Sequence, residues 1–287
     1  VGLIMLQPDF GSALVYIPIF LVMCYVAKIP KRYIMLILSI GMVTILFTVL
    51  PIWQTEIAKK TYPILNVLIN MKLRLIIILA PLLIAIISVI GFIFTKKRYY
   101  YWIAYVFSVF SISLIVSILA GKVLADYQVK RLIIFLAPES DRYGYGWNIR
   151  NSKIAIGSGG LFGQGYMQGP QSHLDYLPEK STDFIFSILS EEWGFIGCVI
   201  VFILYFTIFL RCIKIMNNTT NTYGYYITTG IFTMLLFHFV INVGMVMGIM
   251  PATGIPLCFL SYGGSSLWTA MTCVGLLLSI NARKLDF

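Results

Sequence analysis

The sequence predicts an all-α polytopic membrane protein with about seven transmembrane helices and one large, structured extracellular loop. The 287 residues are 59% hydrophobic and only 11% charged, whereas a soluble domain carries about 25% charged residues. Apolar runs of about 20 residues, the length that crosses a bilayer as a helix, recur along the chain. The short alternating segments that a transmembrane β-barrel needs are absent.

Seven apolar runs set the expected spans, which lie at about Phe10–Ala27, Tyr33–Leu50, Leu73–Thr95, Tyr99–Ala120, Phe184–Leu210, Tyr225–Ile249 and Tyr262–Ile280. The first, third, fifth and seventh runs each end at a cluster of Lys or Arg, which predicts that these ends are cytoplasmic. Lys59 and Lys60 argue against this orientation, but four clusters outweigh one pair. The net charge of +10 therefore reflects topology, and we expect no nucleic-acid partner.

Cysteines and the chain start add two further expectations. The five cysteines lie in or beside apolar runs without paired spacing, which predicts free buried thiols and neither a disulfide framework nor a zinc site. The chain has no initiator Met, and Val1 begins inside an apolar run. We therefore expect a chain that is incomplete at its N-terminus.

A polar stretch, residues 121–182, separates the fourth and fifth runs. Its segment "IAIGSGGLFGQGYMQGP" is rich in glycine, which predicts turns with positive φ or close backbone approach. Regular apolar positions favour a packed loop over a flexible one. Lys130, Arg131, Arg142, Arg150 and Lys153 could attract phosphates, although solvated loop charges are the commoner explanation.

Acidic residues gather where the fifth run begins, in "STDFIFSILSEEWGFIG". Ser181 or Thr182 is expected to cap a helix that starts near Asp183. Glu191 and Glu192 fall about two turns deeper, and at least one should face the bundle interior, because a lipid-facing Glu is costly. A purely structural role, as a cap and an interhelical contact, remains open for these acids.

Asp9 and the segment "NVGMVMGIMPATGIPLCFLSYGGSS" flank other apolar runs. Asp9 is either functional or a helix N-terminal acid that the helix dipole favours. Gly244 and Gly248 have the spacing of tight helix contacts. Pro251, Gly254 and Pro256, in the same segment, should break regular structure at the outer surface. Such backbone must be buried or line a cavity, unless it is an ordinary re-entrant turn.

Three stretches together resemble the SEDS family, the RodA/FtsW polytopic glycosyltransferases of bacterial cell walls. They are "QPDFGSA", "SKIAIGSGGLFGQGYMQGPQSHLDYLPEKSTDFIFSILSEEWGFIG" and the "NVGMVMG…SYGGSS" segment, and their wording is closer to RodA-like members. The resemblance implies a multi-pass protein of the bacterial cytoplasmic membrane that polymerises lipid II on the outer face. It also implies roles in cell-wall elongation and cell shape, with a class B penicillin-binding protein as partner. The choice between elongation and division stays open.

The resemblance assigns the essential loop acid to Asp183, in "TDFIF". A placed carboxylate suits the general base that takes the proton from the acceptor 4-hydroxyl. The leaving pyrophosphate needs positive charge, from a divalent cation such as Mg²⁺ or Mn²⁺ or from a loop cation, Lys153 first. The further supporting or substrate-binding residues that it implies are Asp9, Lys153, Gly159, Gly160, Glu179, Gly254 and Ser265.

Departures from the family pattern qualify the expectation. Ser181 stands where the family commonly has His before the Thr-Asp pair. Residues 73–120 look like an inserted helix pair, and about five spans would be missing before Val1, so residues 1–287 are expected to form a single but N-terminally incomplete SEDS-type domain. Two other functions remain open: a flippase for lipid-linked precursors, and a non-catalytic scaffold for the penicillin-binding protein.

Overall fold

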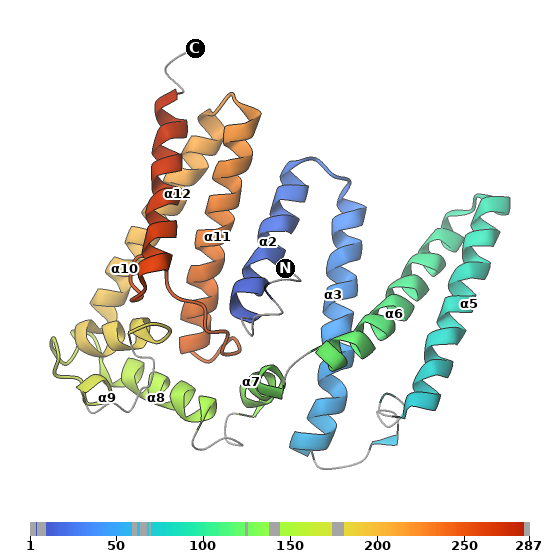
Figure 1. The fold of residues 1–287 in the computed structure, drawn as a ribbon, viewed down its shortest axis with the longest axis horizontal. Coiled ribbons are helices and arrows are strands. Elements are labelled where there is room, and N and C mark those ends of the chain that lie inside the picture. Colours follow the sequence, from blue (N-terminus) through green and yellow to red (C-terminus); the bar gives the residue numbers. More distant parts are fainter. Residues whose placement is uncertain are drawn as a thin grey trace. The chain divides into compact units, whose positions relative to one another are not determined.

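The computed structural model describes residues 4, 10–58, 62–63, 68, 70–123, 126–137, 144–173 and 181–283. These residues are helical or irregular, with no strand among them (Figure 1). The chain forms two compact units: the first contains residues 1–28 and 134–287, and the second contains residues 29–133. Each unit has its own helices and its own packed core.

The membrane-spanning helices agree with the expected spans. Among the described residues, six helices are long and apolar enough to cross a bilayer, and these cover Lys31–Thr55, Leu73–Thr95, Arg98–Leu119, Ile185–Asn218, Thr222–Val246 and Gly264–Ala282. The remaining expected span, the first in the chain, is α2 (Phe10–Val26), an apolar helix of 17 residues that is about 25 Å long. The chain is a multi-pass membrane protein.

The second unit consists mainly of α3 (Lys31–Ile52), the π-helical turn η1 (Trp53–Ala58), α5 (Met71–Thr95) and α6 (Arg98–Val123). Side-chain hydroxyls connect its helices. Ser113 Oγ of α6 donates to the Ile40 carbonyl of α3 at 3.1 Å, and Arg74 Nη2 of α5 donates to Ser117 Oγ of α6 at 2.5 Å. Such polar contacts are common between transmembrane helices, because lipid supplies no hydrophobic drive for their association.

The first unit is built around α11 (Thr222–Val246), which contacts α2, α8 (Tyr145–Ser158), α10 (Ile185–Asn218) and α12 (Gly264–Ala282) (Figure 1). Its most apolar window is 61% buried, compared with 22% and 33% for α5 and α6. A core of aliphatic and aromatic side chains lies between α8, α10, α11 and the segment before α12. This burial lets the first unit hold backbone that is not helical.

The stretch at 121–182 is structured where the structure describes it, as expected. It contains α7 (Asp126–Leu136), α8 and the short α9 (Pro170–His173). Gly160, Gly163 and Gly165 have positive φ, which confirms the prediction of glycine-dependent turns. The five cysteines are free, as predicted, but only Cys212 and Cys258 are buried, and the other three are partly exposed.

Candidate functional site

Asp183 lies in a turn before α10. The helix begins at Ile185, Phe184 is its N-cap, and no side chain caps it. The prediction that Ser181 or Thr182 caps a helix starting near Asp183 is therefore wrong. The physical reason lies in the backbone of residues 181–183, whose carbonyls are bound by neighbouring segments and so are fixed outside the helix. The Asp183 side chain is partly exposed.

Asn242 of α11 holds the Asp183 backbone. Its Nδ2 donates to the Asp183 carbonyl at 2.9 Å and to the Ile255 carbonyl at 2.8 Å, and the side chain is fully buried. One amide thus ties the turn before α10 to the segment that follows α11. Because both acceptors lie outside helices, neither has an intrahelical donor to replace it.

The two residues before Asp183 are held in the same way from the segment before α12. Ser261 Oγ donates to the Thr182 carbonyl at 2.6 Å and accepts from the Leu257 amide at 2.7 Å. The Tyr262 amide donates to the Ser181 carbonyl at 2.8 Å. Three consecutive carbonyls, at 181, 182 and 183, therefore each have a donor from outside the turn. We call these contacts the carbonyl clamp.

The segment 247–263 that supplies much of the clamp is non-helical, as the prolines and glycines predict, and its middle part is largely buried. Ala252, Ile255 and Leu257 are almost inaccessible. The start of α2 also reaches this segment, since a Cβ on Gly11 would lie 2.5 Å from the Thr253 carbonyl oxygen. Asp9, in the same "QPDFG" motif, lies outside the described residues. Gly254 lies within the segment and has positive φ.

Lys153 lies where α8 meets the end of α11. Ser152 Oγ contacts both the Val246 carbonyl and Ser187 Oγ at 2.7 Å, which joins α8 to α11 and to the first turn of α10. The Lys153 amine end lies against Gly248, at a place where a Cβ would overlap it. Lys153 is thus one residue from a contact with the helix that Asp183 precedes.

Gly244 and Gly248 do not make the expected helix–helix contact. Gly248 follows the end of α11 and has a φ of 71°, so it belongs to the turn that the Lys153 side chain covers. A Cβ on Gly244 would lie 3.0 Å from Met250 of the same segment. Both glycines lie at the exit of the chain from α11. Gly248 does lie tightly against Ile149 and Lys153 of α8, but from outside α11, and Gly244 faces Met250, so the pair does not form one helix-packing face as predicted.

Besides the carbonyl clamp, the site contains a break in α10. Gly194 has a φ of 65° within the helix. The amides of Phe195 and Ile196 donate to the carbonyls of Gly160 and Leu161, at 2.9 and 3.2 Å. The carbonyls of residues 191 and 192 accept from the amides of residues 164 and 165, at 2.9 and 3.1 Å. Segment 160–165 therefore replaces the helical hydrogen bonds that the break removes.

Glycine is required where this segment touches α10. A Cβ on Gly159 would overlap the Ser190 carbonyl oxygen, and one on Gly163 would overlap the Glu192 carbonyl oxygen. Gly159 and Gly160 thus have a clear role in closing the helix break. The structure shows no contact of either glycine with the turn that carries Asp183.

Glu191 is buried at the same break. Its side chain has no exposed area, and its Oε1 accepts from the Gln171 amide at 2.9 Å. The expectation that at least one of Glu191 and Glu192 faces the interior is confirmed for Glu191. Its partner is the backbone of the loop, so this acid fastens the loop to α10.

Two other expected residues contribute less to this arrangement. Ser265 lies in the first turn of α12 with an exposed side chain, and its carbonyl accepts from Thr269 Oγ1 at 2.9 Å. Glu179 lies outside the described residues. In the part of the chain that the structure describes, no three His, Cys, Asp or Glu side chains are grouped as a metal ion would need. These residues supply no donor set for a divalent cation.

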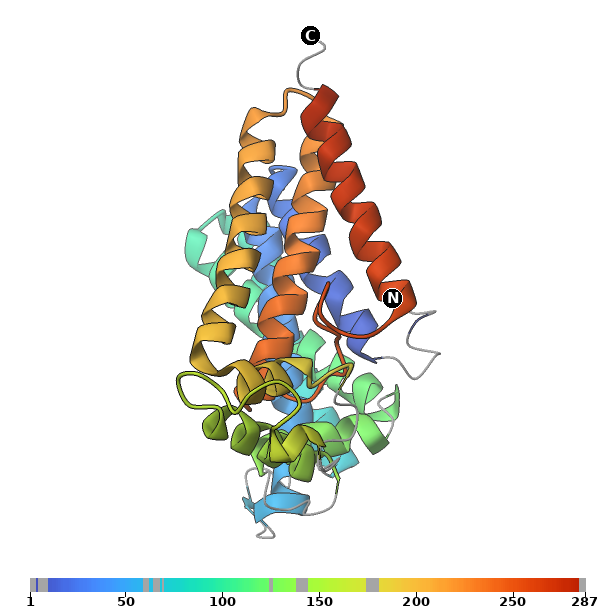
Figure 2. The ribbon, with the colours of Figure 1, turned by 90° about the vertical axis from the view of Figure 1, so that its left-hand side faces the viewer.

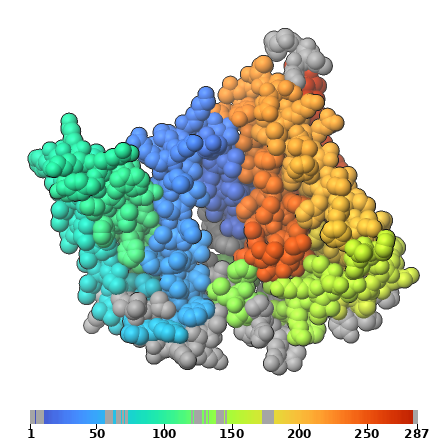
Figure 3. Space-filling view, turned by 180° about the vertical axis from the view of Figure 1, so that it is seen from behind, coloured from blue at the N-terminus to red at the C-terminus, as the bar shows by residue number. Residues whose placement is uncertain are grey.

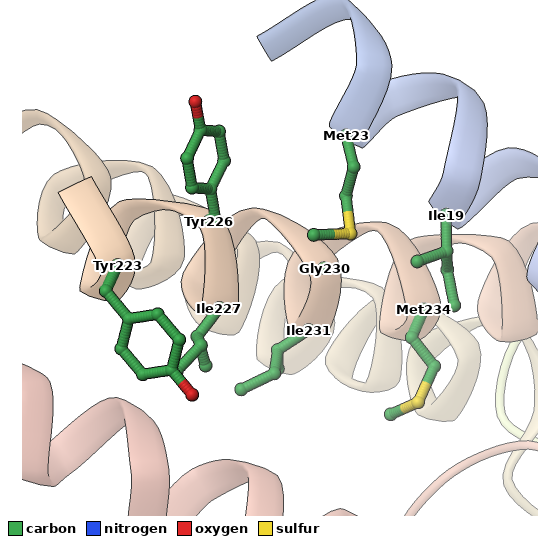
Figure 4. A pocket seen from close by; sticks show the side chains of 8 residues that line it. All are labelled: Ile19, Met23, Tyr223, Tyr226, Ile227, Gly230, Ile231 and Met234. Carbon is green, nitrogen blue, oxygen red and sulfur yellow. The ribbon is translucent and has the colours of Figure 1, made fainter. Parts of the chain in front are cut away.

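An apolar cavity of about 480 Å³ lies between α2 and α11, at the far end of α11 from Asn242. Ile19 and Met23 point from α2 toward α11 (Figure 4), and Gly230 leaves room for Met23, since its Cβ would lie 3.8 Å from the Met23 sulfur. The residues that line it are apolar except for Tyr223 and Tyr226. The cavity has no acid or cation and is not a candidate for glycosyl transfer.

Sequence reasoning missed the residues that position Asp183. Asn242 and Ser261 carry the carbonyl clamp, and Ser152 and Ser187 connect α8 to α10. Asn242 could have been found, because a lone amide at the end of an apolar run is costly unless it is satisfied inside the protein. The serines carried no such signal, because a hydroxyl can hydrogen-bond to nearby backbone in most local structures.

The sequence around this site matches a known family. A model of the FtsW/RodA/SpoVE family, described as cell cycle protein, matches residues 56–285. The chain belongs to this family. It is the SEDS family that the motifs resemble, and the matched region contains Asp183, the carbonyl clamp and the break in α10.

Named relatives of this SEDS chain include peptidoglycan glycosyltransferases. RodA of Treponema pallidum (strain Nichols) is 52% identical over 284 residues, which are 99% of this chain and 66% of that protein. MrdB of Escherichia coli (strain K12) is 44% identical over 159 residues, 55% of this chain and 43% of that protein. Stage V sporulation protein E of Bacillus subtilis (strain 168) is 45% identical over 157 residues, 55% and 42% respectively.

The chain spans about two thirds of the length of the Treponema relative and less than half of the other two. The Treponema match extends over nearly the whole chain, and so includes residues 73–120. Whether that helix pair is an insertion relative to other SEDS members stays a prediction.

A solved structure shares the fold. The chain is similar to one from the structure titled "Structural coordination of polymerization and crosslinking by a peptidoglycan synthase complex", with a TM-score of 0.50 and 21% identity. The similarity covers 99% of this chain and 94% of that one. At 21% identity, this similarity shows a shared arrangement of helices and nothing about function.

Proposed function

We propose that this SEDS chain is a peptidoglycan glycosyltransferase that polymerises lipid II, with Asp183 as the general base. The observation that carries the proposal is the carbonyl clamp: three consecutive carbonyls around Asp183 are bound from two other segments, while its side chain stays partly exposed. A base needs a fixed position and access to its substrate at the same time. The named activities of the Treponema and E. coli relatives support the same reaction class.

The proposed step is a direct displacement. The acceptor 4-hydroxyl gives its proton to an Asp183 carboxylate oxygen as the hydroxyl oxygen bonds to the anomeric carbon of the donor sugar. The bond between that carbon and the pyrophosphate oxygen breaks, and undecaprenyl pyrophosphate leaves. Lys153, which the contacts of Ser152 hold near the first turn of α10, is the cation that we propose for the negative charge of the leaving group. A divalent cation remains a prediction, and no step here depends on one.

We also propose that Asp183 faces the outside of a bacterial cytoplasmic membrane. Basic residues follow α2 at Lys28 and α5 at Lys96 and lie in the last part of α10 at Arg211 and Lys214, which supports a cytoplasmic location for these ends. The start of α10 is then on the opposite side, where lipid II is polymerised. A class B penicillin-binding protein is the partner that we infer from the family resemblance.

The test is the Asp183→Asn variant in a polymerisation assay with purified lipid II. We expect the polymerisation rate to fall about 100- to 10,000-fold, the usual contribution of a general base. Folding should be little affected, because Asn is close to Asp in size and shape and the carbonyl clamp binds backbone atoms at 181–183. An unchanged unfolding midpoint together with a normal polymer yield would exclude Asp183 as the base.

The Asp183→Asn variant also distinguishes the two other candidate functions, the flippase and the scaffold. Movement of lipid II across sealed vesicles without polymer, equal in wild type and Asp183→Asn, would indicate a flippase. Full complementation of a deletion strain by Asp183→Asn would indicate a scaffold.

A further inference from the structure

The loop that closes the break in α10 presents apolar side chains on its outer side. Leu161, Phe162, Tyr166 and Met167, which we call the apolar loop cluster, are 65%, 80%, 73% and 60% exposed. Residues 159–172 contain no charged side chain. A loop that faces water over its whole length normally carries charges or small polar residues, so this composition needs a different environment.

The cluster is held rigidly. Four backbone hydrogen bonds fix residues 160–165 to the break, and Gln164 Nε2 donates to the Ser158 carbonyl at 3.2 Å. Met167 has a φ of 57°, a conformation that non-glycine residues adopt at a cost. The cluster therefore cannot turn inward to bury its side chains, because its backbone is already committed to α10.

The cluster continues the lipid-facing surface of α10. Gly160 and Leu161 bind the amides of Phe195 and Ile196, so the loop lies directly beside that part of the helix (Figure 2). Trp193 and Phe195 are 57% and 60% exposed. These values are close to those of apolar residues deeper in the span, such as Phe206 at 61%. From behind, the yellow-green loop region forms one surface with the lower end of the gold α10 (Figure 3).

Helix length gives the level of the cluster in the membrane. A bilayer core of about 30 Å takes about 20 helical residues. Counting back about 20 residues from Arg211, which marks the opposite end of the span, leads to Glu191 and the break. The break thus lies at the boundary between hydrocarbon and headgroups, and the turn with Asp183 lies about 12–16 Å beyond it.

We propose that the apolar loop cluster is an interfacial anchor that inserts into the lipid leaflet on the Asp183 side of the membrane. Aromatic and long apolar side chains favour this layer, where their apolar parts meet lipid and a tyrosine hydroxyl meets water. The occupant is lipid because the cluster is uncharged, is continuous with the lipid face of α10 and lies at the level of the interface. The anchor fixes the height of the break, and through the helix it fixes the height of the Asp183 turn. Only this last consequence depends on the proposed function.

The chain contains its own control for this proposal. Tyr166 and Tyr262 are similarly exposed, at 73% and 80%, but Tyr262 lies beside the Asp183 turn because its amide binds Ser181. Hydroxyl-radical footprinting of the unmodified protein in nanodiscs of phosphatidylcholine and phosphatidylglycerol, read by mass spectrometry, measures both. We expect Tyr166 to be oxidised roughly tenfold more slowly than Tyr262, because lipid excludes water from its ring. Equal rates would overturn the anchor.

A second measurement separates lipid from protein as the cover. An environment-sensitive fluorophore is placed on Phe162→Cys, or on Ser181→Cys as the control, in a chain whose five native cysteines are replaced by alanine. We expect lipids with a spin label high on the acyl chain to quench position 162, and aqueous iodide to quench position 181. If position 162 is protected yet lipid does not quench it, a second copy of the chain covers the cluster, and the proposal is wrong. The footprinting arm needs no substitution, so equal oxidation of Tyr166 and Tyr262 would overturn the anchor even if the variant does not fold.

Discussion

The two units use hydrogen bonds for different purposes. In the second unit, the hydroxyls of Ser113 and Ser117 join α3, α5 and α6, which stay regular helices along the contact. In the first unit, Asn242, Ser261 and the amides of segment 160–165 bind carbonyls and amides that have left the helical pattern. A helical carbonyl already has a donor, so an extra contact adds little. A non-helical buried carbonyl has no other donor, so losing its contact costs the full desolvation penalty.

The largest effect should come from Asn242→Leu. This change removes the donor for the carbonyls of Asp183 and Ile255, and each unpaired buried group costs about 1–3 kcal/mol. We expect the free energy of unfolding to fall by about 2–5 kcal/mol, measured in detergent micelles. Hydrogen exchange of residues 181–183 should also become faster.

The matched control for Asn242 lies on the same helix. Thr233 Oγ1 donates to the Thr229 carbonyl one turn earlier, and that carbonyl is within the helix. Thr233→Val should therefore cost well under half as much. Equal losses for the two variants would refute the distinction between the units.

The next effect in size should come from the glycines before the α10 break. Gly159→Ala places a methyl group against the Ser190 carbonyl, and overpacking of this kind costs about 1–3 kcal/mol. Gly157, two residues earlier in α8, has open space at its Cβ position. Gly157→Ala should instead stabilise the protein by about 0.5–1 kcal/mol, because alanine favours the helix. Unfolding midpoints of the pair test this, and a loss for both variants would contradict the contact.

A small effect is expected in the second unit. Ser113→Ala removes one hydroxyl contact to Ile40, a carbonyl inside α3. Contacts of this kind between membrane helices contribute about 0.6 kcal/mol on average. If Ser113→Ala lowered the free energy of unfolding as much as Asn242→Leu does, the hydroxyls of the second unit would be as important for stability as the contacts of the first unit.

The smallest effect at neutral pH concerns Cys258, in the buried segment before α12. Burial raises the pKa of its thiol from 9.0 to about 11, so the thiol should stay protonated and unreactive to maleimide at pH 8. The folded state then holds this proton more tightly than the unfolded chain does. Its contribution to stability is complete below pH 9 and is lost as the pH rises through about 11. Cys258→Ala should weaken that decline, and labelling at pH 8 without denaturant would disprove the burial.

Sequence reasoning predicted the helices well, because the period and length of apolar runs follow from the bilayer. Span Leu73–Thr95 was predicted within two residues of α5. It also located the buried proline-rich turn after α11 and the interior position of Glu191. Asp183 was identified by a motif, and its role remains a proposal.

The remaining features depend on tertiary contacts that no local pattern encodes. The break at Gly194 lies within a continuous apolar run. It is stable because residues 160–165 supply the hydrogen bonds that the break removes from the helix. The predicted start of α10 was wrong for the same reason. Ser181 and Thr182 have the residue types of N-caps, but their carbonyls accept hydrogen bonds from the Tyr262 amide and from Ser261 Oγ, about 80 residues away. Gly244 and Gly248 have the spacing of a helix-packing motif, but two glycines near the end of a helix can have the same spacing because the chain turns there.

The break in α10 has a consequence for how the protein is made. The amides of Phe195 and Ile196 and the carbonyls of Glu191 and Glu192 have partners in residues 160–165. Those residues precede α10 in the chain, so they leave the ribosome first. When α10 enters the membrane, the segment that completes its hydrogen bonds is already available. A rearranged gene that encoded this loop after α10 would present the bilayer with an incomplete helix during insertion.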